Sequence, residues 1–513
     1  MILRWKPIRR PRPLCSTLTH HSRVHFDSPV FLSSASVRGR LRLQVASTKT
    51  TPTLPSDAPV EDVYFPEDDV EDLEQYRPGG YHPTLIDDTF QDGRYTVVHK
   101  LGYGGYSTIW LARDHQENRY VSLKIKVSEL FSPSRENQIL RLLGDHDSKE
   151  EGSRFIPRLM DEFSFVGPNG NHSCLIGQPA GLNISVSKDI SPNWKFPVES
   201  ARSIAAQLAM GLLYIHKQGV CHGGSCFPPS RLPILFDGAW ISWHDLSILN
   251  SLLDLHLRNF LLRMPSIDHL AREELYERYR KPFPVPVRRL DGKDPQPQAP
   301  PHAIYPMSVQ MPADKVMDPE IFISDYGTSF VVSQEPNPTL HTPALYLPPE
   351  DFFSEPVTLA ADVWTLGVSL YEVLGERPLF ETFAWDRDDI IAEMVSTLGI
   401  LPSRWWDKWA NRGEFFNPDG SWIPANQLRR ITTPIFRPLH QRMWDMGRGE
   451  TPGDCEWDVD GGEMRALEEL LMGMLAFEPS QRLTAEEVMA SEYMTKWAMP
   501  AWQRRTKRIS RKP

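Results

Sequence analysis

Two polar residues precede a short apolar run near the middle of this chain, and their spacing constrains the fold around them. Asp254 and Asn259 are separated by four residues, and Phe260-Leu261-Leu262 follows directly. A carboxylate in such a loop can accept the proton of a hydroxyl group, and a nearby amide oxygen can hold a hard cation. The pair alone is a weak signal, because two polar residues at this interval occur by chance in many loops. The interpretation therefore depends on partner groups elsewhere in the chain.

A glycine-rich segment lies upstream, between two strand-like runs at residues 94–100 and 108–112. Small residues in such a hairpin let backbone amides approach phosphate groups closely. The residues that we expect to contact a nucleotide are Gly102, Gly104, Gly105, Ser107, which stands where a third glycine is expected, and Ile109. An ordinary glycine-rich hairpin turn is the alternative interpretation of this segment.

A lysine and a glutamate follow at positions that favour an ion pair. Lys124 ends the β-patterned run 120–124, and Glu136 lies in the helix-like segment 132–143. An ammonium group on such a strand can bind nucleotide phosphates, and the carboxylate of Glu136 is expected to reach across to it. A solvated lysine and a surface carboxylate are the alternatives when each residue is taken alone.

Two further carboxylates stand downstream in the sequence. Asp325 follows an apolar strand in the run Asp-Tyr-Gly, for which an ordinary turn is the alternative interpretation. Glu350 closes a proline-rich turn, for which a plain surface turn is the alternative. A buried glutamate at this place needs a cationic partner, and an arginine can bind a carboxylate through two parallel hydrogen bonds.

The segment that begins at residue 361 is predicted to be a buried helix. Its apolar side chains lie on one side of such a helix; they are Val363, Leu366, Leu370, Val373 and Leu374. Core packing accounts for this stripe. Asp362, in the first turn, is expected to hold the backbone of the loop that carries Asp254. A plain carboxylate at a helix N-terminus is the alternative.

In this order the motifs resemble those of the eukaryotic-type protein kinases, and more closely those of the fungal serine/arginine-rich-protein kinases, a group called SRPK-like here. The closer resemblance is carried by residues 101–112, 286–293 and 342–346, and the similarity extends over residues 76–497. It implies an α+β, bilobal protein kinase fold with a small β-rich N-lobe and a larger helical C-lobe.

The resemblance also implies a chemistry. ATP and Mg²⁺ would serve to phosphorylate serine or threonine in a protein substrate, which the family suggests to be Arg-Ser-rich and to act in mRNA processing. Asp254 would be the catalytic base, with Lys124 and Glu136 as the other catalytic residues, and Asn259 and Asp325 would bind magnesium. Arg482 stands where these kinases keep the arginine that would pair with Glu350. A monomer in the nucleus and cytoplasm, with no direct nucleic-acid or membrane partner, is the corresponding expectation.

The chain departs from the family pattern at the loop itself. A His-Gly pair is expected directly before Asp254, but His222-Gly223 is followed by residues 224–253 before the pattern resumes. Deleting that segment restores the motif without a gap, so our hypothesis is a retained intron or a misassigned exon. The segment also contains a second Asp-x4-Asn pair, Asp245 and Asn250, which is the alternative catalytic loop.

Two rival functions follow from this loop. Its pattern also resembles that of small-molecule phosphotransferases, but these lack the set formed by Glu350, Asp362 and Arg482. The other rival is a pseudokinase or inactive gene variant, which would bind a nucleotide or a partner as a scaffold without catalysis.

Composition bounds the partners and the compartment. With 513 residues, 40% hydrophobic residues and a net charge of −10, the chain can build one bilobal domain with tails. No apolar run is long enough to span a membrane. The five cysteines have no disulfide or zinc-site spacing, so a reducing compartment is expected. The acidic balance argues against direct nucleic-acid binding and suits a basic substrate.

The ends of the chain differ from its centre. The first fifty residues are basic and contain many serines, which is typical of a mitochondrial transit peptide or of a disordered basic tail. Proline-rich residues 281–312 are predicted to be a surface insertion with little regular structure. The predicted divisions are a basic then acidic tail over 1–75, the N-lobe over 76–180, the C-lobe over 181–500 with insertions at 224–253 and 281–312, and a basic tail over 501–513.

Overall fold

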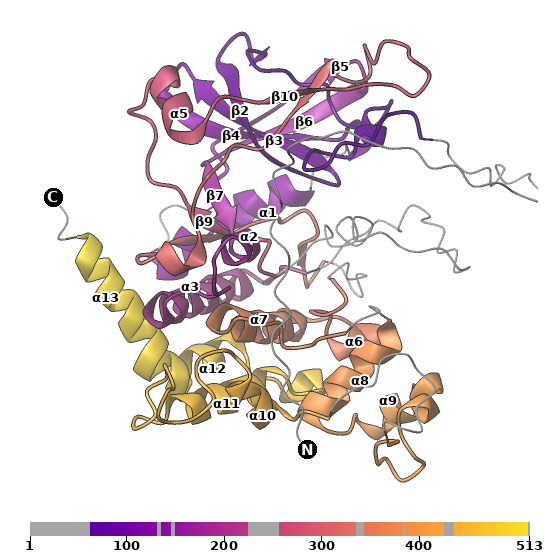
Figure 1. Cartoon of the computed structure of the whole chain (residues 1–513), viewed down its shortest axis with the longest axis vertical. Coiled ribbons are helices and arrows are strands. Elements are labelled where there is room, and N and C mark those ends of the chain that lie inside the picture. The colour runs from indigo at the N-terminus through magenta and orange to yellow at the C-terminus, as the bar shows by residue number, and fades with distance from the viewer. Residues whose placement is uncertain are drawn as a thin grey trace, which may run out of the picture. The chain divides into compact units, whose positions relative to one another are not determined.

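The structure, a computed structural model, describes residues 62–130, 135–144, 149–223, 256–334, 343–382, 386–424 and 436–510. Asp254, the alternative pair Asp245 and Asn250, and Thr342 lie outside the described residues. Within the described ranges the predicted α+β, bilobal architecture is confirmed, because a sheet-rich N-lobe precedes a helical C-lobe (Figure 1).

The N-lobe contains a six-stranded antiparallel sheet with the strand order β1-β2-β3-β4-β6-β5. The strands are β1 Thr89–Phe90, β2 Tyr95–Gly104, β3 Ser107–Asp114, β4 Arg119–Lys126, β5 Asp161–Gly167 and β6 Gly170–Gly177. Alternate side chains such as Val97, Trp110 and Leu123 are buried together in a core on one face of the sheet. The three strands predicted from the sequence correspond to β2, β3 and β4.

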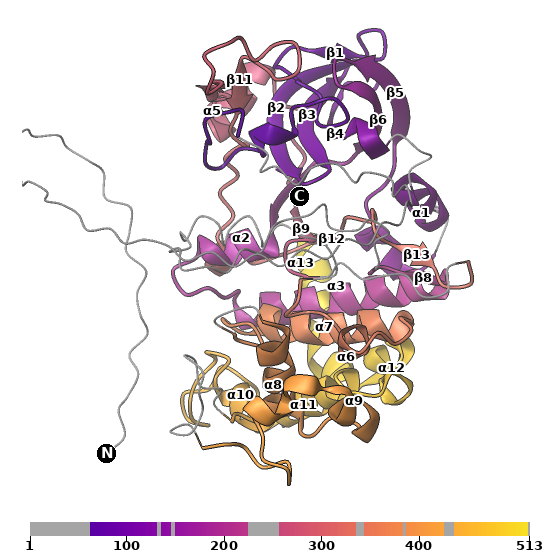
Figure 2. The ribbon, with the colours of Figure 1, turned by 90° about the vertical axis from the view of Figure 1, so that its right-hand side faces the viewer.

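Helices form most of the C-lobe, after α1 Arg135–Leu143 in the N-lobe. They are α2 Ile184–Asp189, α3 Val198–Lys217, α6 Pro349–Phe352, α7 Leu359–Leu374, α8 Arg387–Leu398, α9 Ser403–Lys408, α10 Leu439–Trp444, α11 Glu463–Met474, α12 Ala485–Ala490 and α13 Met499–Ile509. α5 Arg272–Tyr279 lies beside the N-lobe sheet instead (Figure 1). α7 is the predicted central helix, and α3 lies beside it in both views (Figures 1 and 2). No described helix is long and apolar enough to cross a membrane.

Two small sheets join segments that are distant in the sequence. β9 Phe260–Arg263 pairs with β12 Ile321–Ile323 and with β7 Ala180–Asn183, and β8 Val220–Cys221 pairs with β13 Phe330–Val331. The end of β8 and the start of β9 flank the undescribed residues 224–255. The flank that ends in β8 therefore pairs with β13, and the flank that leads into β9 pairs with β12.

The described parts of the predicted N-terminal tail and of the predicted insertion are folded, which differs from the expectation. β10 Pro284–Pro286 pairs with β11 His302–Ile304, and backbone hydrogen bonds of 2.8 and 2.9 Å join residues 63–65 to residues 288–290. Side chains from both segments form one buried apolar cluster with the N-lobe, made of Tyr64, Val70, Leu73, Tyr76, Tyr81, Val127, Val287, Ala299 and Ala303. The acidic and proline-rich composition of the two segments did not indicate a core, because their few apolar residues are buried only when the two segments meet.

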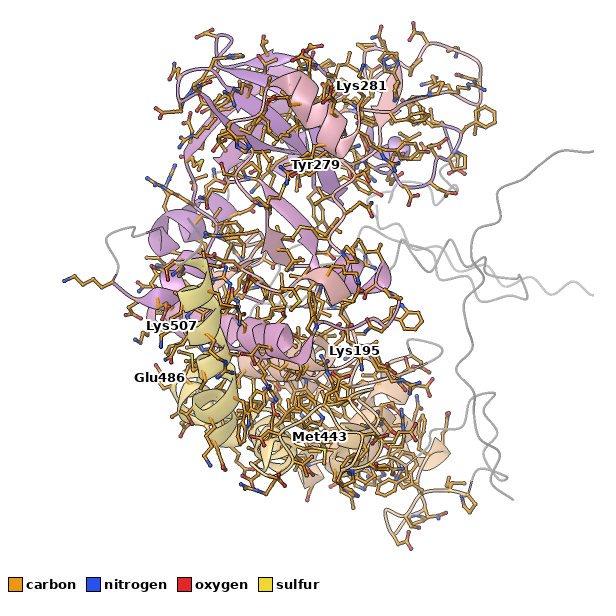
Figure 3. The ribbon with its side chains drawn as sticks, turned by 60° about the vertical axis from the view of Figure 1, so that its left-hand side comes forward. Lys195, Tyr279, Lys281, Met443, Glu486 and Lys507 are labelled. Carbon is orange, nitrogen blue, oxygen red and sulfur yellow. The ribbon has the colours of Figure 1, made fainter. Side chains whose placement is uncertain are left out.

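The insertion has a second contact with the N-lobe through α5, which precedes it. Tyr279, at the end of this helix, is buried with Val98 of β2 and Leu111 of β3. Figure 3 labels Tyr279 and Lys281 beside the strands of the sheet. Residues that follow β9 in the sequence thus return to cover the N-lobe.

The predicted basic C-terminal tail is also folded where it is described. α13 begins at Met499, ahead of the predicted boundary, and packs against α3 with Ala501 and Trp502 buried. Arg505 is buried as well, because its guanidinium lies 2.8 Å from the carboxylate of Glu320. A count of basic residues could not distinguish this amphipathic helix from a solvated tail.

The ion pair of Glu350 and Arg482 joins three parts of the C-lobe. The guanidinium donates bidentate hydrogen bonds of 2.7 and 2.5 Å to the carboxylate, and both side chains are fully buried. Arg482 also donates to the carbonyl oxygens of Ala360 in α7, Ala476 and Phe477. Every charge of this pair is thus matched, as burial requires.

Arg482→Met should destabilise the C-lobe strongly, because it leaves the carboxylate of Glu350 buried without its partner. We expect a loss of about 3–5 kcal/mol in the free energy of unfolding, measured by urea denaturation. Arg465→Met is the matched control, since Arg465 forms exposed pairs with Glu469 and Glu492, and it should cost below about 1 kcal/mol. Equal losses for the two variants would contradict this role of the buried pair.

Candidate active site

Two strand lysines share one helix carboxylate at the edge of the N-lobe. Lys124 and Lys126 of β4 point to the same side of the sheet because side chains alternate along a strand. Lys124 Nζ lies 2.7 Å from Glu136 Oε1, and Lys126 Nζ lies 2.6 Å from Glu136 Oε2. α1, which carries Glu136, is thereby fixed to β4. The expected partner of Lys124 is in place, and Lys126 is a second partner that sequence reasoning missed.

These charges hold one another in the ionised state. Burial alone would lower the pKa of Lys124, but the nearby carboxylates of Glu136 and Asp325 outweigh it and raise that pKa above its usual value. Burial likewise opposes ionisation of Glu136, yet the two lysines lower the pKa of its carboxyl group. Both groups of the pair are therefore charged at neutral pH.

The pairing of β9 with β12 brings the two candidate metal ligands together. Ile323 is opposite Phe260, so Asn259 precedes one strand end where Ser324 and Asp325 follow the other. The backbone N–H of Ser324 donates to the carbonyl oxygen of Asn259 at 2.9 Å, and the Ser324 hydroxyl donates to the same oxygen at 2.8 Å. The side-chain amide of Asn259 and the carboxylate of Asp325 thus belong to neighbouring turns.

Asp325 links this edge of the C-lobe to the lysine of the N-lobe. Its Oδ1 lies 3.6 Å from Lys124 Nζ, and its backbone has a φ of +66°. A non-glycine residue in this left-handed region is uncommon, and such residues cluster at functional sites. Tyr326, the next residue, is buried with its ring 4.8 Å from that of His222.

The glycine-rich hairpin connects β2 to β3 next to Lys124. Ile109 of β3 is the cross-strand partner of Lys124, and Gly104 is opposite Ser107 at the hairpin tip. A Cβ atom added at Gly102, Gly104 or Gly105 would meet no atom within 4 Å. The space above the hairpin is thus open for a ligand that approaches the backbone.

Asp362, in the first turn of α7, holds the start of the interrupted loop, as the sequence predicted. Its carboxylate accepts hydrogen bonds of 2.8 and 3.1 Å from the backbone N–H groups of His222 and Gly223. His216 Nε2 lies 3.1 Å from the same carboxylate. Burial raises the pKa of this carboxyl group, but His216 and His222 together with the backbone donors bring it below its usual value. Asp362 is therefore a buried anion with several donors.

Both flanks of the undescribed loop contact the same residue. His222 Nε2 lies 3.0 Å from the carbonyl oxygen of Ser324, whose own N–H donates to Asn259. On the second flank, His256 is buried, with its ring 5.6 Å from that of Tyr346. Asp254, the predicted base, is outside the described residues, so the structure positions its neighbours and not the residue itself.

The predicted magnesium ligands can be tested against the donor set. Within the described ranges no group of three or more His, Cys, Asp or Glu side chains is arranged to hold a metal ion. Mg²⁺ needs no such cage, because it is commonly held by one or two protein ligands together with phosphate oxygens and water. Asn259 and Asp325 fit a metal that arrives with a nucleotide.

Known proteins are similar in sequence to parts of this chain. The protein kinase domain family matches residues 314–494. Serine/threonine-protein kinase SKY1 of Saccharomyces cerevisiae is 35% identical over 159 residues, which are 30% of this chain and 21% of that protein. SRSF protein kinase 3 of Homo sapiens is 36% identical over 154 residues, 29% of this chain and 27% of that protein. Serine/threonine-protein kinase SRPK of Physarum polycephalum is 24% identical over 443 residues, 84% of this chain and 92% of that protein.

The alignments cover different shares of the relatives' lengths. The matches with the yeast and human kinases span less than a third of those relatives, whereas the match with the Physarum kinase spans nearly its whole length. The family match lies in the C-lobe, and the hairpin, Lys124 and Glu136 complete the arrangement on the N-lobe side. In fold and in sequence the chain is similar to the SRPK-like eukaryotic protein kinases.

Proposed function

We propose that this chain is a serine/threonine protein kinase that uses ATP and Mg²⁺. The observation that carries the proposal is the position of Lys124 between Glu136 at 2.7 Å and Asp325 at 3.6 Å, beside the open glycine-rich hairpin. Phosphoryl transfer needs charged groups that are positioned in advance, and the protein contributes mainly orientation and electrostatic stabilisation.

Each proposed role follows from the chemistry of the group. Lys124 would bind the α and β phosphates, held in place by Glu136. The oxygens of Asn259 and Asp325 would bind Mg²⁺, which neutralises charge on the phosphates when the nucleotide is bound. Asp254 would orient the hydroxyl group of the substrate and accept its proton.

Arg-Ser-rich proteins are the proposed substrates, with a role in mRNA processing. One relative is named as a kinase of SRSF proteins, and the net charge of −10 suits a basic protein partner. Action in the nucleus and cytoplasm as a monomer, without direct nucleic-acid contact, completes this proposal.

The segment 224–253 is proposed to lower the activity of this kinase, because it separates Asp254 in the sequence from the backbone that Asp362 holds. Without it, Asp254 and Leu255 alone would connect Gly223 to His256. Such a short connection agrees with the structure, in which Ser324 contacts His222 on one flank and Asn259 on the other. A chain of this length would place Asp254 directly after two backbone groups that are already fixed.

Removal of residues 224–253 should restore or greatly increase phosphorylation of an Arg-Ser peptide. We expect a gain on the order of 10²–10⁴ in kcat, the usual contribution of a positioned acid-base group, in a radiolabelled ATP assay of the two forms. The same deletion with Asp254→Asn is the control and should lose the gain. Equal activity of the full and shortened chains would contradict the proposed effect of the segment.

Lys124→Met should reduce kcat/KM by about 10²–10³, as expected for removal of one electrostatic group at a transferred phosphoryl group. The form of the chain that is active toward the peptide provides the assay. Lys126→Met is the matched control, because it removes the other lysine that contacts Glu136 and leaves Lys124 in place. If the control variant loses as much activity as Lys124→Met, the lysines act through the fold and the assigned role is wrong.

A further inference from the structure

The tip of the glycine-rich hairpin contains the peptide bond of the site that is easiest to reorient. Gly104 and Gly105 flank it, and glycine has the widest choice of backbone angles. Gly105 and Tyr106 form the two-residue turn, and neither has a positive φ. The turn is thus not one of the primed types that match the twist of paired strands in a short hairpin. A hairpin closed in this way depends more on contacts from outside.

One such contact comes from Tyr81, which precedes the sheet. Its hydroxyl group donates a hydrogen bond of 2.8 Å to the carbonyl oxygen of Gly104. Because a trans peptide is planar, the N–H of Gly105 points in the direction opposite to that carbonyl. No residue in the described part of the chain accepts a hydrogen bond from the Gly105 N–H. Together with the pairing of Gly104 with Ser107, Tyr81 therefore holds the direction of a backbone donor at the open hairpin.

The Tyr81 side chain is itself held firmly. It is 2% exposed, and its ring packs edge-on against Tyr76 with the centroids 5.6 Å apart. Its backbone N–H donates to the carbonyl of Gln75 at 2.9 Å. The amide of Asn169 donates to the carbonyl of Tyr81 at 2.6 Å and to that of Gln298 at 2.7 Å. Segments from three parts of the chain thus meet at this residue.

Two of these segments belong to or adjoin regions that composition suggested to be a tail, residues 1–75, and a surface insertion, residues 281–312. Residues 62–81 and residues 284–303 share a buried cluster that includes Val287, Ala299 and Ala303. Burial raises the pKa of the Tyr81 hydroxyl well above its usual value, so the group is a hydrogen-bond donor throughout the neutral range. The cluster therefore holds the Tyr81 side chain in contact with the hairpin backbone.

We propose that Tyr81 is a positioning residue for the nucleotide phosphates, which it serves by holding the Gly104–Gly105 peptide so that the Gly105 N–H is directed at a phosphate oxygen. This inference rests on the proposed function, since it requires that the hairpin binds ATP. It assigns a role to the N-terminal segment and the insertion, which act on nucleotide affinity through one hydroxyl group.

The test compares binding of ATP, ADP and adenosine to the full chain in the presence of Mg²⁺, by isothermal titration calorimetry. Tyr81→Phe removes the hydroxyl group and keeps the buried ring. We expect the Kd for ATP and for ADP to rise about 3- to 10-fold, the range for loss of one hydrogen bond, while the Kd for adenosine stays within twofold of wild type. Adenosine lacks phosphates, so a general loosening of the N-lobe would weaken all three ligands.

Tyr76→Phe is the matched control in the same cluster. The Tyr76 hydroxyl donates to the buried carboxylate of Glu71, which also accepts from Lys100, whereas the Tyr81 hydroxyl donates to the backbone of Gly104. This variant should lower the midpoint of thermal unfolding without a selective loss of ATP affinity. Unchanged ATP affinity in Tyr81→Phe, or an equal loss for ATP and adenosine, would overturn the positioning role alone. Failure of the wild-type chain to bind ATP would overturn the proposed function together with this inference.

Discussion

The candidate site depends on one physical constraint, which is that a charged group removed from water needs a partner of opposite charge. Lys124 is placed on a strand of the N-lobe, Glu136 on a helix beside it, and Asp325 at the end of a strand in the C-lobe. Burial of any one of these charged groups without a partner would be unfavourable, because an unmatched buried charge costs several kcal/mol. The two carboxylates around one ammonium therefore fix the relation of β4, α1 and the turn after β12. The glycine-rich hairpin joins β2 to β3, and β3 pairs with the strand that carries this ammonium, which supports the proposed site for phosphates.

The sequence predicted those parts of the fold whose signal lies in local order. The strands around the hairpin, the buried helix α7 and the Glu350–Arg482 pair were all recognisable, because each has a strong periodicity or a fixed place in a known series of motifs. Lys126 was missed although strand alternation placed it on the same face as Lys124, since the motif names one lysine only. Alternation along β4 was the signal that would have found it.

The remaining differences arise where distant segments meet. Acidic residues separate Tyr64 from Tyr76, and nothing local indicates that Val287 and Ala299 complete their core. The same reason applies to α13, whose Trp502 and Arg505 are buried by contacts with α3 and Glu320. Composition describes how a segment would behave in solvent. It cannot report the apolar surface that another part of the chain offers.

Magnesium-dependent binding of ATP to the full chain tests the central claim most directly. Isothermal titration calorimetry with and without Mg²⁺ measures it, and Asp325→Asn tests the metal ligand in the same experiment. The account predicts saturable ATP binding that weakens at least tenfold, about 1.4 kcal/mol, when Mg²⁺ is removed, and it predicts that Asp325→Asn loses most of that dependence. No binding of ATP, or binding that is equally tight without Mg²⁺, would contradict the assignment of Lys124, Asn259 and Asp325 to a nucleotide site.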